Sequence, residues 1–162
     1  MFQPPSDYHF ITHWRTEGEI HDVYHTLSEP LHYPDWWKGP QLRVTEIEPA
    51  DEGGLNQIVQ FEIKGWLPYT LRWQFKGTEF NPPHGFTSQA SGDLVGSGVW
   101  LLKQDSRWVD ITFDWNVRAE KPLLRRCSFF LRPIFALNHD WVMAKLKEGL
   151  RLELARLKGR KR

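Results

Sequence analysis

The sequence predicts an α+β fold: a curved antiparallel sheet of about six to seven strands, with two short helices after the first strand, wrapped around a long C-terminal helix. Three features of the residue pattern lead to this prediction. Apolar and polar residues alternate through most of residues 43–118, as in strands with one buried and one solvated face. Short turn-like segments separate these runs, which favours hairpin connections. After Pro122 the apolar residues repeat at the spacing of a helix.

One strand and two short helices are expected at the start of the chain. Residues 8–17 alternate in polarity, and Gly18 ends the strand. The next apolar residues repeat at helical spacing and predict a short amphipathic helix: Ile20, Val23, Tyr24 and Leu27. Residues 31–37 form a second short helix or turn, which ends at Trp36 and Trp37.

Six alternating segments predict the rest of the sheet. They cover residues 43–48, 59–64, 71–76, 86–91, 95–103 and 108–118. The last segment shows the pattern most clearly, because its apolar residues all share one face: Val109, Ile111, Phe113, Trp115 and Val117. Asp110 and Asp114 share the other face, about 13 Å apart at the rise of a strand, so they do not form a paired catalytic site.

A helix is expected over residues 134–157, with Pro133 at its first position, where a missing N–H costs nothing. Residues 123–132 are either a helical lead-in to it or irregular. Its apolar stripe includes Leu131, Phe135, Val142, Leu146 and Gly149. Asn138 lies near the centre of this stripe, where its amide either serves a ligand or bonds to the sheet backbone. Because a single helix cannot fill the concave face of a strongly curved sheet, the remaining space predicts a cavity.

The chain contains nine tryptophans and ten phenylalanines, and strand parity places many of them on the concave face. We expect this cavity to be a site for an apolar ligand, since such sites are concave and lined by aromatic side chains. Its expected lining residues are Trp14, Trp73, Phe86, Trp100, Phe113, Trp115, Asn138, Trp141 and Val142. Trp36 and Trp37 are expected at the cavity mouth.

Composition and charge exclude several classes of protein. Hydrophobic residues make up 40% and charged residues 25%, so the chain is not disordered. No apolar run approaches the ~20 residues of a membrane span, and no secretory signal is expected at the start. The only cysteine, Cys127, forms no internal disulfide and is expected to be a buried structural thiol in a cytoplasmic protein.

The charge is concentrated at the C-terminus, where residues 151–162 hold six Lys or Arg and one Glu. Cations at the end of a helix complement its dipole, and this is the simplest interpretation of the cluster. A weak contact with a membrane surface through the basic tail, residues 158–162, is the alternative. No basic stripe interleaved with exposed aromatics is present, so we expect no nucleic-acid partner.

Neither a metal site nor a cofactor is expected. His21 and His25 are four residues apart, but both should face solvent, and no third ligand lies near them in the sequence. His139 and Asp140 are neighbours on a helix and therefore point about 100° apart. The glycines at 92, 96 and 98 lie between strands rather than before a helix, so they are not a phosphate loop.

Several segments resemble the polyketide cyclase/dehydrase-like branch of the START-like (Bet v 1-like, SRPBCC) superfamily. These segments are Trp36-Trp37, residues 90–94 with Gly96 and 98–100, and residues 138–143. The resemblance extends from about Tyr8 to Leu157 and implies a helix-grip fold, in which a curved sheet grips a C-terminal helix around an apolar ligand cavity. It implies one START-like domain over residues 1–162, with its core at about 8–157.

Three functions fit these observations. The first is binding, with transport or sequestration, of a small hydrophobic or aromatic molecule such as a lipid, isoprenoid or polyketide. The second is a cyclase/dehydrase-type enzyme, in which His139 or Asn138 would act with Arg72 or Arg132. The third is a protein-interaction module that uses the outer sheet or the basic tail. The pattern favours binding, because no inward-facing acid–base pair emerges and thus no catalytic residue is assigned. We expect a monomer or a homodimer.

Overall fold

The computed structural model describes residues 7–52 and 54–161, without the side chains of residues 123–131. Its strands are β1 Asp7–Glu17, β2 Gln41–Glu48, β3 Ile58–Lys64, β4 Leu71–Asn81, β5 Gly85–Gly92, β6 Leu94–Asp105 and β7 Trp108–Ala119. Its helices are α1 Ile20–Ser28, the 3-10 turn η1 Pro30–His32, α2 Tyr33–Trp36 and α3 Pro122–Arg160. The expected α+β class and order of elements are confirmed.

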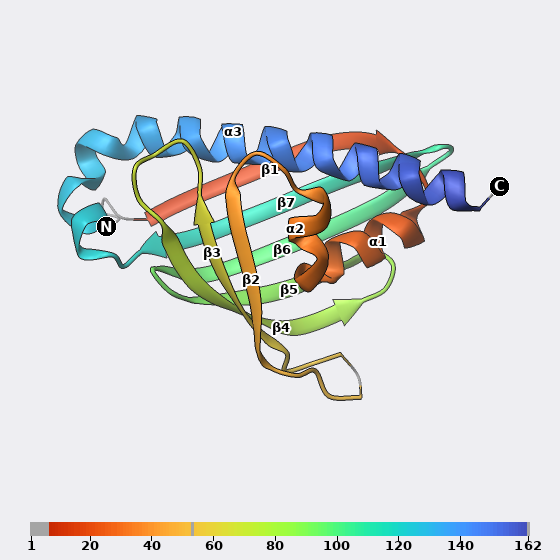
Figure 1. Ribbon diagram of the computed structural model, residues 1–162, viewed down its shortest axis with the longest axis horizontal. Helices are drawn as coiled ribbons and strands as arrows, with labels where there is room; N and C mark the ends of the chain where they lie inside the picture. The colour runs from red at the N-terminus through yellow and green to blue at the C-terminus, as the bar shows by residue number, and fades with distance from the viewer. Residues whose placement is uncertain (1–6, 53, 162) are drawn as a thin grey trace.

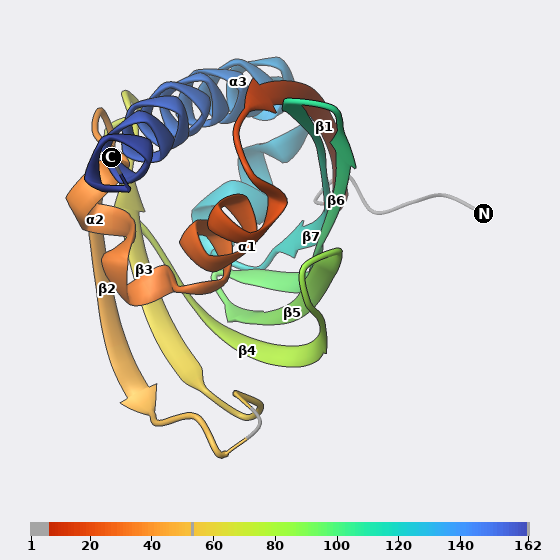
Figure 2. The same cartoon turned by 90° about the vertical axis from the view of Figure 1, so that its right-hand side faces the viewer.

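All seven strands form one antiparallel sheet in the order β1-β7-β6-β5-β4-β3-β2. Strands β2 to β7 are a meander, and β1 returns to pair with β7 along its whole length, from Asp7 opposite Arg118 to Glu17 opposite Trp108. Figure 1 shows α3 running along the open side of this sheet. In Figure 2 the sheet forms the curved wall, α3 closes its top, and α1 lies across the near opening.

The two faces of the sheet differ as the alternation predicts. In β7, the residues Val109, Ile111 and Phe113 are buried on the concave side. The two aspartates of β7 lie on the convex side and are engaged by β1: Arg15 Nε donates to Asp110 at 2.8 Å, and His9 Nε2 lies 2.7 Å from Asp114. These carboxylates therefore form cross-strand surface pairs and no paired acid site.

The C-terminal helix starts earlier than expected. It begins at Pro122 and not at Pro133, which lies inside the helix. The first N–H groups of a helix have no acceptor within the helix, so a proline there loses no hydrogen bond. Pro122 occupies such a position at the observed start of α3. An interior proline removes one backbone hydrogen bond but does not end a helix that is held by tertiary packing. The helix also includes residues 158–160 of the predicted basic tail.

Strand β4 also differs from the expected segment, because it continues to Asn81. Its pairing with β5 shifts register between Gly77 and Glu79, which indicates a β-bulge. A bulge adds one residue and reverses the parity of everything after it. Phe80 consequently faces the interior, where its ring stacks on Phe86 with centroids 6.1 Å apart.

Helices α1 and α2 close one end of the curved sheet. The predicted apolar face of α1 is buried, as expected, at Ile20, Val23, Tyr24 and Leu27. Helix α2 packs directly on α3: a Cβ atom added to Gly149 would lie only 2.3 Å from the carbonyl oxygen of Trp36. A glycine at position 149 therefore permits the contact between these two helices.

We expect Gly149→Ala to destabilise the protein by about 1–3 kcal/mol, because the added methyl group overlaps backbone that cannot easily move. In an unobstructed helix the same change stabilises by up to ~1 kcal/mol. Gly159→Ala is the matched control, since nothing lies within 4 Å of its Cβ position in the same helix. Urea denaturation of both variants measures the difference, and equal stabilities would contradict the packing role of Gly149.

Candidate ligand-binding site

A cavity of about 200 Å³ lies between the concave face of the sheet and α3. Strands β1 and β3 to β7 contribute to its wall, α3 forms its roof, and Leu27, Pro30, Tyr33 and Trp37 contribute from the segment between β1 and β2. Most of its lining side chains are apolar or aromatic. The cavity expected from a single helix on a curved sheet is therefore present.

Seven of the expected lining residues border this cavity: Trp73, Phe86, Trp100, Phe113, Trp115, Asn138 and Val142. Their rings form a continuous wall across the sheet. Trp100 stacks on Phe113 with centroids 4.2 Å apart, Phe113 stacks on Trp115 at 5.7 Å, and Trp115 lies 6.3 Å from Trp73. A flat apolar guest would meet aromatic faces along this wall.

Two expected lining residues, Trp14 and Trp141, do not border the cavity. Trp14 lies on the predicted face of β1, but the ammonium group of Lys147 from α3 sits 5.5 Å from its ring centroid, and its ring packs edge-on against Trp100. The helix therefore covers Trp14. Trp141 lies on the flank of α3, where the ammonium of Lys145 sits 5.8 Å from its ring.

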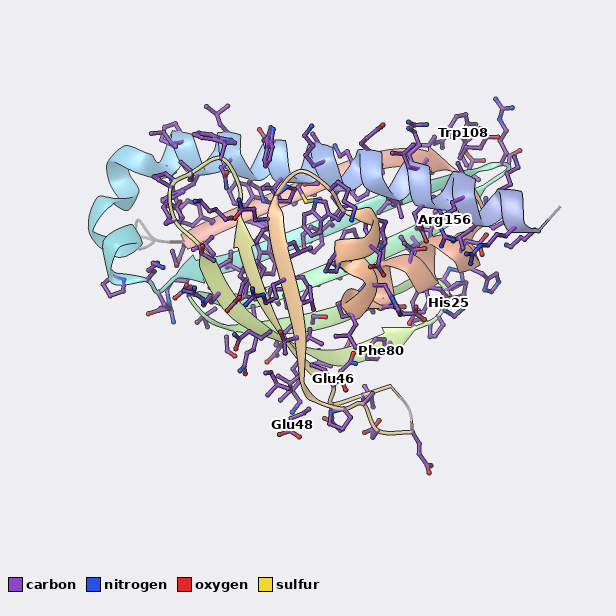
Figure 3. The ribbon with its side chains drawn as sticks, in the orientation of Figure 1. His25, Glu46, Glu48, Phe80, Trp108 and Arg156 are labelled. Carbon is purple, nitrogen blue, oxygen red and sulfur yellow. The ribbon has the colours of Figure 1, made fainter. Side chains whose placement is uncertain are left out.

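The two tryptophans expected at the cavity mouth stack on each other, with ring centroids 6.5 Å apart. Trp37 borders the cavity, and its indole N–H donates to the carbonyl of Val142 at 3.3 Å, which ties the end of α2 to α3. Trp36 is buried on the other side of α2, beside a surface groove that includes His25 and Arg156. Figure 3 shows those two labelled side chains at the α1 end of the molecule. The expectation that Trp36 lies at the mouth is corrected, because Trp36 is not among the residues that border the cavity.

Buried polar atoms distinguish this cavity from a simple apolar core. Among the described residues, seven buried side-chain nitrogen or oxygen atoms have no hydrogen-bond partner. Five of them belong to lining residues: Tyr8 Oη, Tyr69 Oη, Trp73 Nε1, Asn138 Oδ1 and His139 Nε2. Each such group costs about 1–3 kcal/mol while it has no partner. These atoms are therefore available to form hydrogen bonds with a molecule bound in the cavity.

Asn138 is placed toward the cavity rather than against the sheet backbone. Its Oδ1 is buried and unpartnered, and it lies beside Gly65, where an added Cβ would come within 2.4 Å of it. The absence of a side chain at position 65 makes room for the carboxamide. Asn138 thus borders the cavity, and its Oδ1 accepts no hydrogen bond from the sheet backbone.

His139 is an uncharged imidazole at neutral pH. Its ring stacks on Phe10 with centroids 4.1 Å apart, and burial lowers its pKa from 6.5 to about 4. The charge of Asp140 acts to raise this pKa, and the charge of Lys147 acts to lower it. His139 Nε2 is buried beside the cavity.

Tyr8, Tyr33 and Tyr69 all border the cavity but differ in their bonding. Tyr33 donates its hydroxyl to the carbonyl of Leu27, so it is satisfied within the fold. Tyr8 and Tyr69 have no such partner, and burial raises the pKa of both phenols. Sequence reasoning missed Tyr69 because it lies in an aperiodic turn. Tyr8 carried a usable signal, since strand parity placed it on the same face as Trp14.

The arginines considered for catalysis are not lining residues. Arg72 lies on the convex face, where its Nε is 3.1 Å from Glu62. Arg132 is exposed, bonds to the carbonyl of Asp7, and holds its guanidinium carbon 5.0 Å from the Tyr8 ring centroid. Neither reaches the cavity, so the expected pairing with His139 or Asn138 does not form.

The histidines considered as metal ligands, His21 and His25, are both exposed, as expected. Within residues 7–52 and 54–161, no group of three or more His, Cys, Asp or Glu side chains has the arrangement of a metal site. The side chain of Cys127 lies outside the described part of the chain, as does that of Leu131.

Comparison with solved structures gives many matches over nearly the whole chain. TTHA0849 from Thermus thermophilus aligns with a TM-score of 0.73 and 14% identity, covering 93% of this chain and 99% of that one. The Zhui aromatase/cyclase from Streptomyces sp. R1128 gives 0.68 and 16%, covering 93% and 94%. A START superfamily protein from Mycobacterium smegmatis gives 0.69 and 8%, covering 92% and 98%.

These matches show that the chain has the START/Bet v 1-like helix-grip fold. Shared architecture at such low identity establishes the fold and not the chemistry. No protein-family model matches the sequence, and no curated protein matches it significantly.

Among the described helices, none is both long enough and apolar enough to cross a membrane.

We expect stability to fall by about 2 kcal/mol between about pH 7 and pH 5, because of His139. The pKa of this group is lower in the folded state than in the unfolded state. The unfolded chain therefore binds a proton below pH 6.5, whereas the folded chain does so only near pH 4. His139→Phe should remove this part of the pH dependence in urea denaturation. His21→Phe, at an exposed position, is the control, and an unchanged slope in His139→Phe would refute the assignment.

Proposed function

We propose that the protein binds a small hydrophobic or aromatic molecule in the cavity between the sheet and α3, and carries or sequesters it. The observation that supports this most directly is an aromatic-lined cavity that also presents five unpartnered polar atoms. A core that served only stability would gain from filling the space and pairing these groups. The arrangement thus favours a site for a guest.

The free energy of binding would come mainly from removing apolar surface from water, at about 25 cal/mol per Å². Part of that gain is offset by the loss of motional freedom of the ligand. The aromatic wall is preformed, since its rings already pack on one another, so little reordering of side chains is required. The START/Bet v 1-like fold, which typically binds hydrophobic ligands, agrees with this function.

Native mass spectrometry of the purified protein tests the proposal directly. We expect a co-purifying apolar mass, or failing that, binding of members of a panel of lipids and flavonoids. If no ligand co-purifies with the protein and no compound of the panel binds to it, the proposal is wrong. Asn138→Ala and His139→Ala are expected to weaken the binding.

Filling the cavity gives an independent test. Val142→Trp adds bulk from α3 into the cavity and should lower the affinity for the uncharged fluorescent dye N-phenyl-1-naphthylamine at least about 10-fold, because its apolar contact surface is lost. Ala144→Trp places the same side chain on the exposed face of α3 and should leave dye binding unchanged. Circular dichroism spectra of both variants establish that they fold. Equal dye affinity in the two folded variants would place the binding site elsewhere.

A cyclase/dehydrase-type activity is the second candidate, favoured by the neutral imidazole of His139 beside the cavity. The structural match to an aromatase/cyclase gives the chemistry to try first. In that case His139→Ala would lower turnover with little loss of ligand affinity. A binding protein would return its ligand chemically unchanged.

A further inference from the structure

We infer that the cavity selects an uncharged, compact ring compound that carries a hydroxyl or carbonyl group, and that it binds this group at one end. This inference rests on the proposed function and adds the chemical class and the orientation of the ligand. This end of the cavity, the polar end, is formed by Tyr8, Tyr69, Asn138 and His139.

The contacts among these residues place them together. Phe135 packs between the two tyrosines, with its ring centroid 5.7 Å from that of Tyr8 and 6.0 Å from that of Tyr69. The Tyr8 ring stacks on Phe10 at 5.9 Å, and Phe10 in turn stacks on the His139 ring. Asn138 Oδ1 lies beside Gly65, in the turn between β3 and β4 that also carries Tyr69. All four residues thus surround the cavity where β1 begins and the first half of α3 passes over it (Figure 1).

The opposite end of the cavity is mainly apolar, although Ser28 and Ser88 also border the cavity near it. Phe86 packs there against Tyr24 of α1 at 5.9 Å and against Trp100 at 6.1 Å. Leu27 of α1 and Leu146 of α3 border the same space and are almost completely buried. A ligand with one polar edge therefore has one favourable orientation, with its apolar body toward α1 and its polar group toward Tyr8 and Tyr69.

The bonding capacity of the polar end suits a hydroxyl or a carbonyl group. The two phenol groups can each donate one hydrogen bond, while Asn138 Oδ1 accepts one. A ligand carbonyl would accept from the tyrosines, and a ligand hydroxyl would accept from a tyrosine and donate to Asn138. A hydrocarbon would leave these groups unpaired, which is the situation that costs free energy.

Charge and size narrow the ligand class further. Of the lining residues in the described part of the chain, none is Lys, Arg, Asp or Glu. The imidazole of His139 is neutral, because burial lowers its pKa to about 4. An ionised ligand group would be desolvated without a counter-ion. The volume of about 200 Å³ lies below the ~300–1,000 Å³ usual for drug-sized ligands, which favours a compact ring system over a long-chain lipid.

Three probes of one ring size test the inference: naphthalene, 2-naphthol and 2-naphthoate, each measured by displacement of the uncharged fluorescent dye N-phenyl-1-naphthylamine at neutral pH. We expect 2-naphthol to bind more tightly than naphthalene and 2-naphthoate to bind most weakly. Tyr8→Phe and Tyr69→Phe should each weaken 2-naphthol binding about 3- to 10-fold and leave naphthalene binding unchanged, because each removes one hydrogen bond.

Tyr24→Phe is the matched control, since Tyr24 is buried but does not border the cavity. It should change the affinity of none of the probes. Equal affinities for naphthalene and 2-naphthol, with no effect of the two tyrosine variants, would overturn the inference and leave the proposed function standing. Preference for 2-naphthoate would overturn it as well, by requiring a buried cation. Failure of all three probes to displace the dye would instead count against the proposed function itself.

Discussion

The fold depends on one constraint, which is that a single helix must cover the concave face of a seven-stranded sheet. Six inter-strand spacings of about 4.8 Å make such a sheet roughly 29 Å wide, whereas a helix with its side chains is about 10–12 Å across. Curvature brings the sheet edges toward α3, and α1 and α2 block one end, yet space remains in the middle. The cavity is thus a geometric consequence of the architecture, and the side chains decide its use.

Those side chains divide the cavity into two environments. Stacked aromatic rings on β5, β6 and β7 form an apolar wall, and aromatic stacking contributes energy beyond the area that it buries. Around Phe135, the hydroxyls of Tyr8 and Tyr69 and the carboxamide of Asn138 are instead buried without partners. A bound molecule with a hydroxyl or carbonyl group would supply hydrogen-bond partners to these groups.

Similarity of fold without similarity of sequence has a physical explanation here. The helix-grip architecture needs alternating strands, short turns, a glycine where α2 meets α3 and an amphipathic helix, and many sequences satisfy these needs. The lining residues belong to the hydrophobic core, but that role requires apolar bulk rather than one particular side chain at each position. Proteins at 8–16% identity can therefore share the fold while their cavities hold different chemistry.

The sequence by itself determined the class of fold, the order of its elements and the face of each strand, because alternation and helical spacing are local properties of the chain. This parity correctly placed Trp73, Trp100 and Trp115 on the cavity wall. Only the tertiary structure decided where along an element the cavity begins and ends. Lys147 covers Trp14, Trp36 stacks on Trp37 without bordering the cavity, and Tyr69 enters from an aperiodic turn. Periodicity gives the direction of a side chain, whereas its neighbours depend on where α3 crosses the sheet.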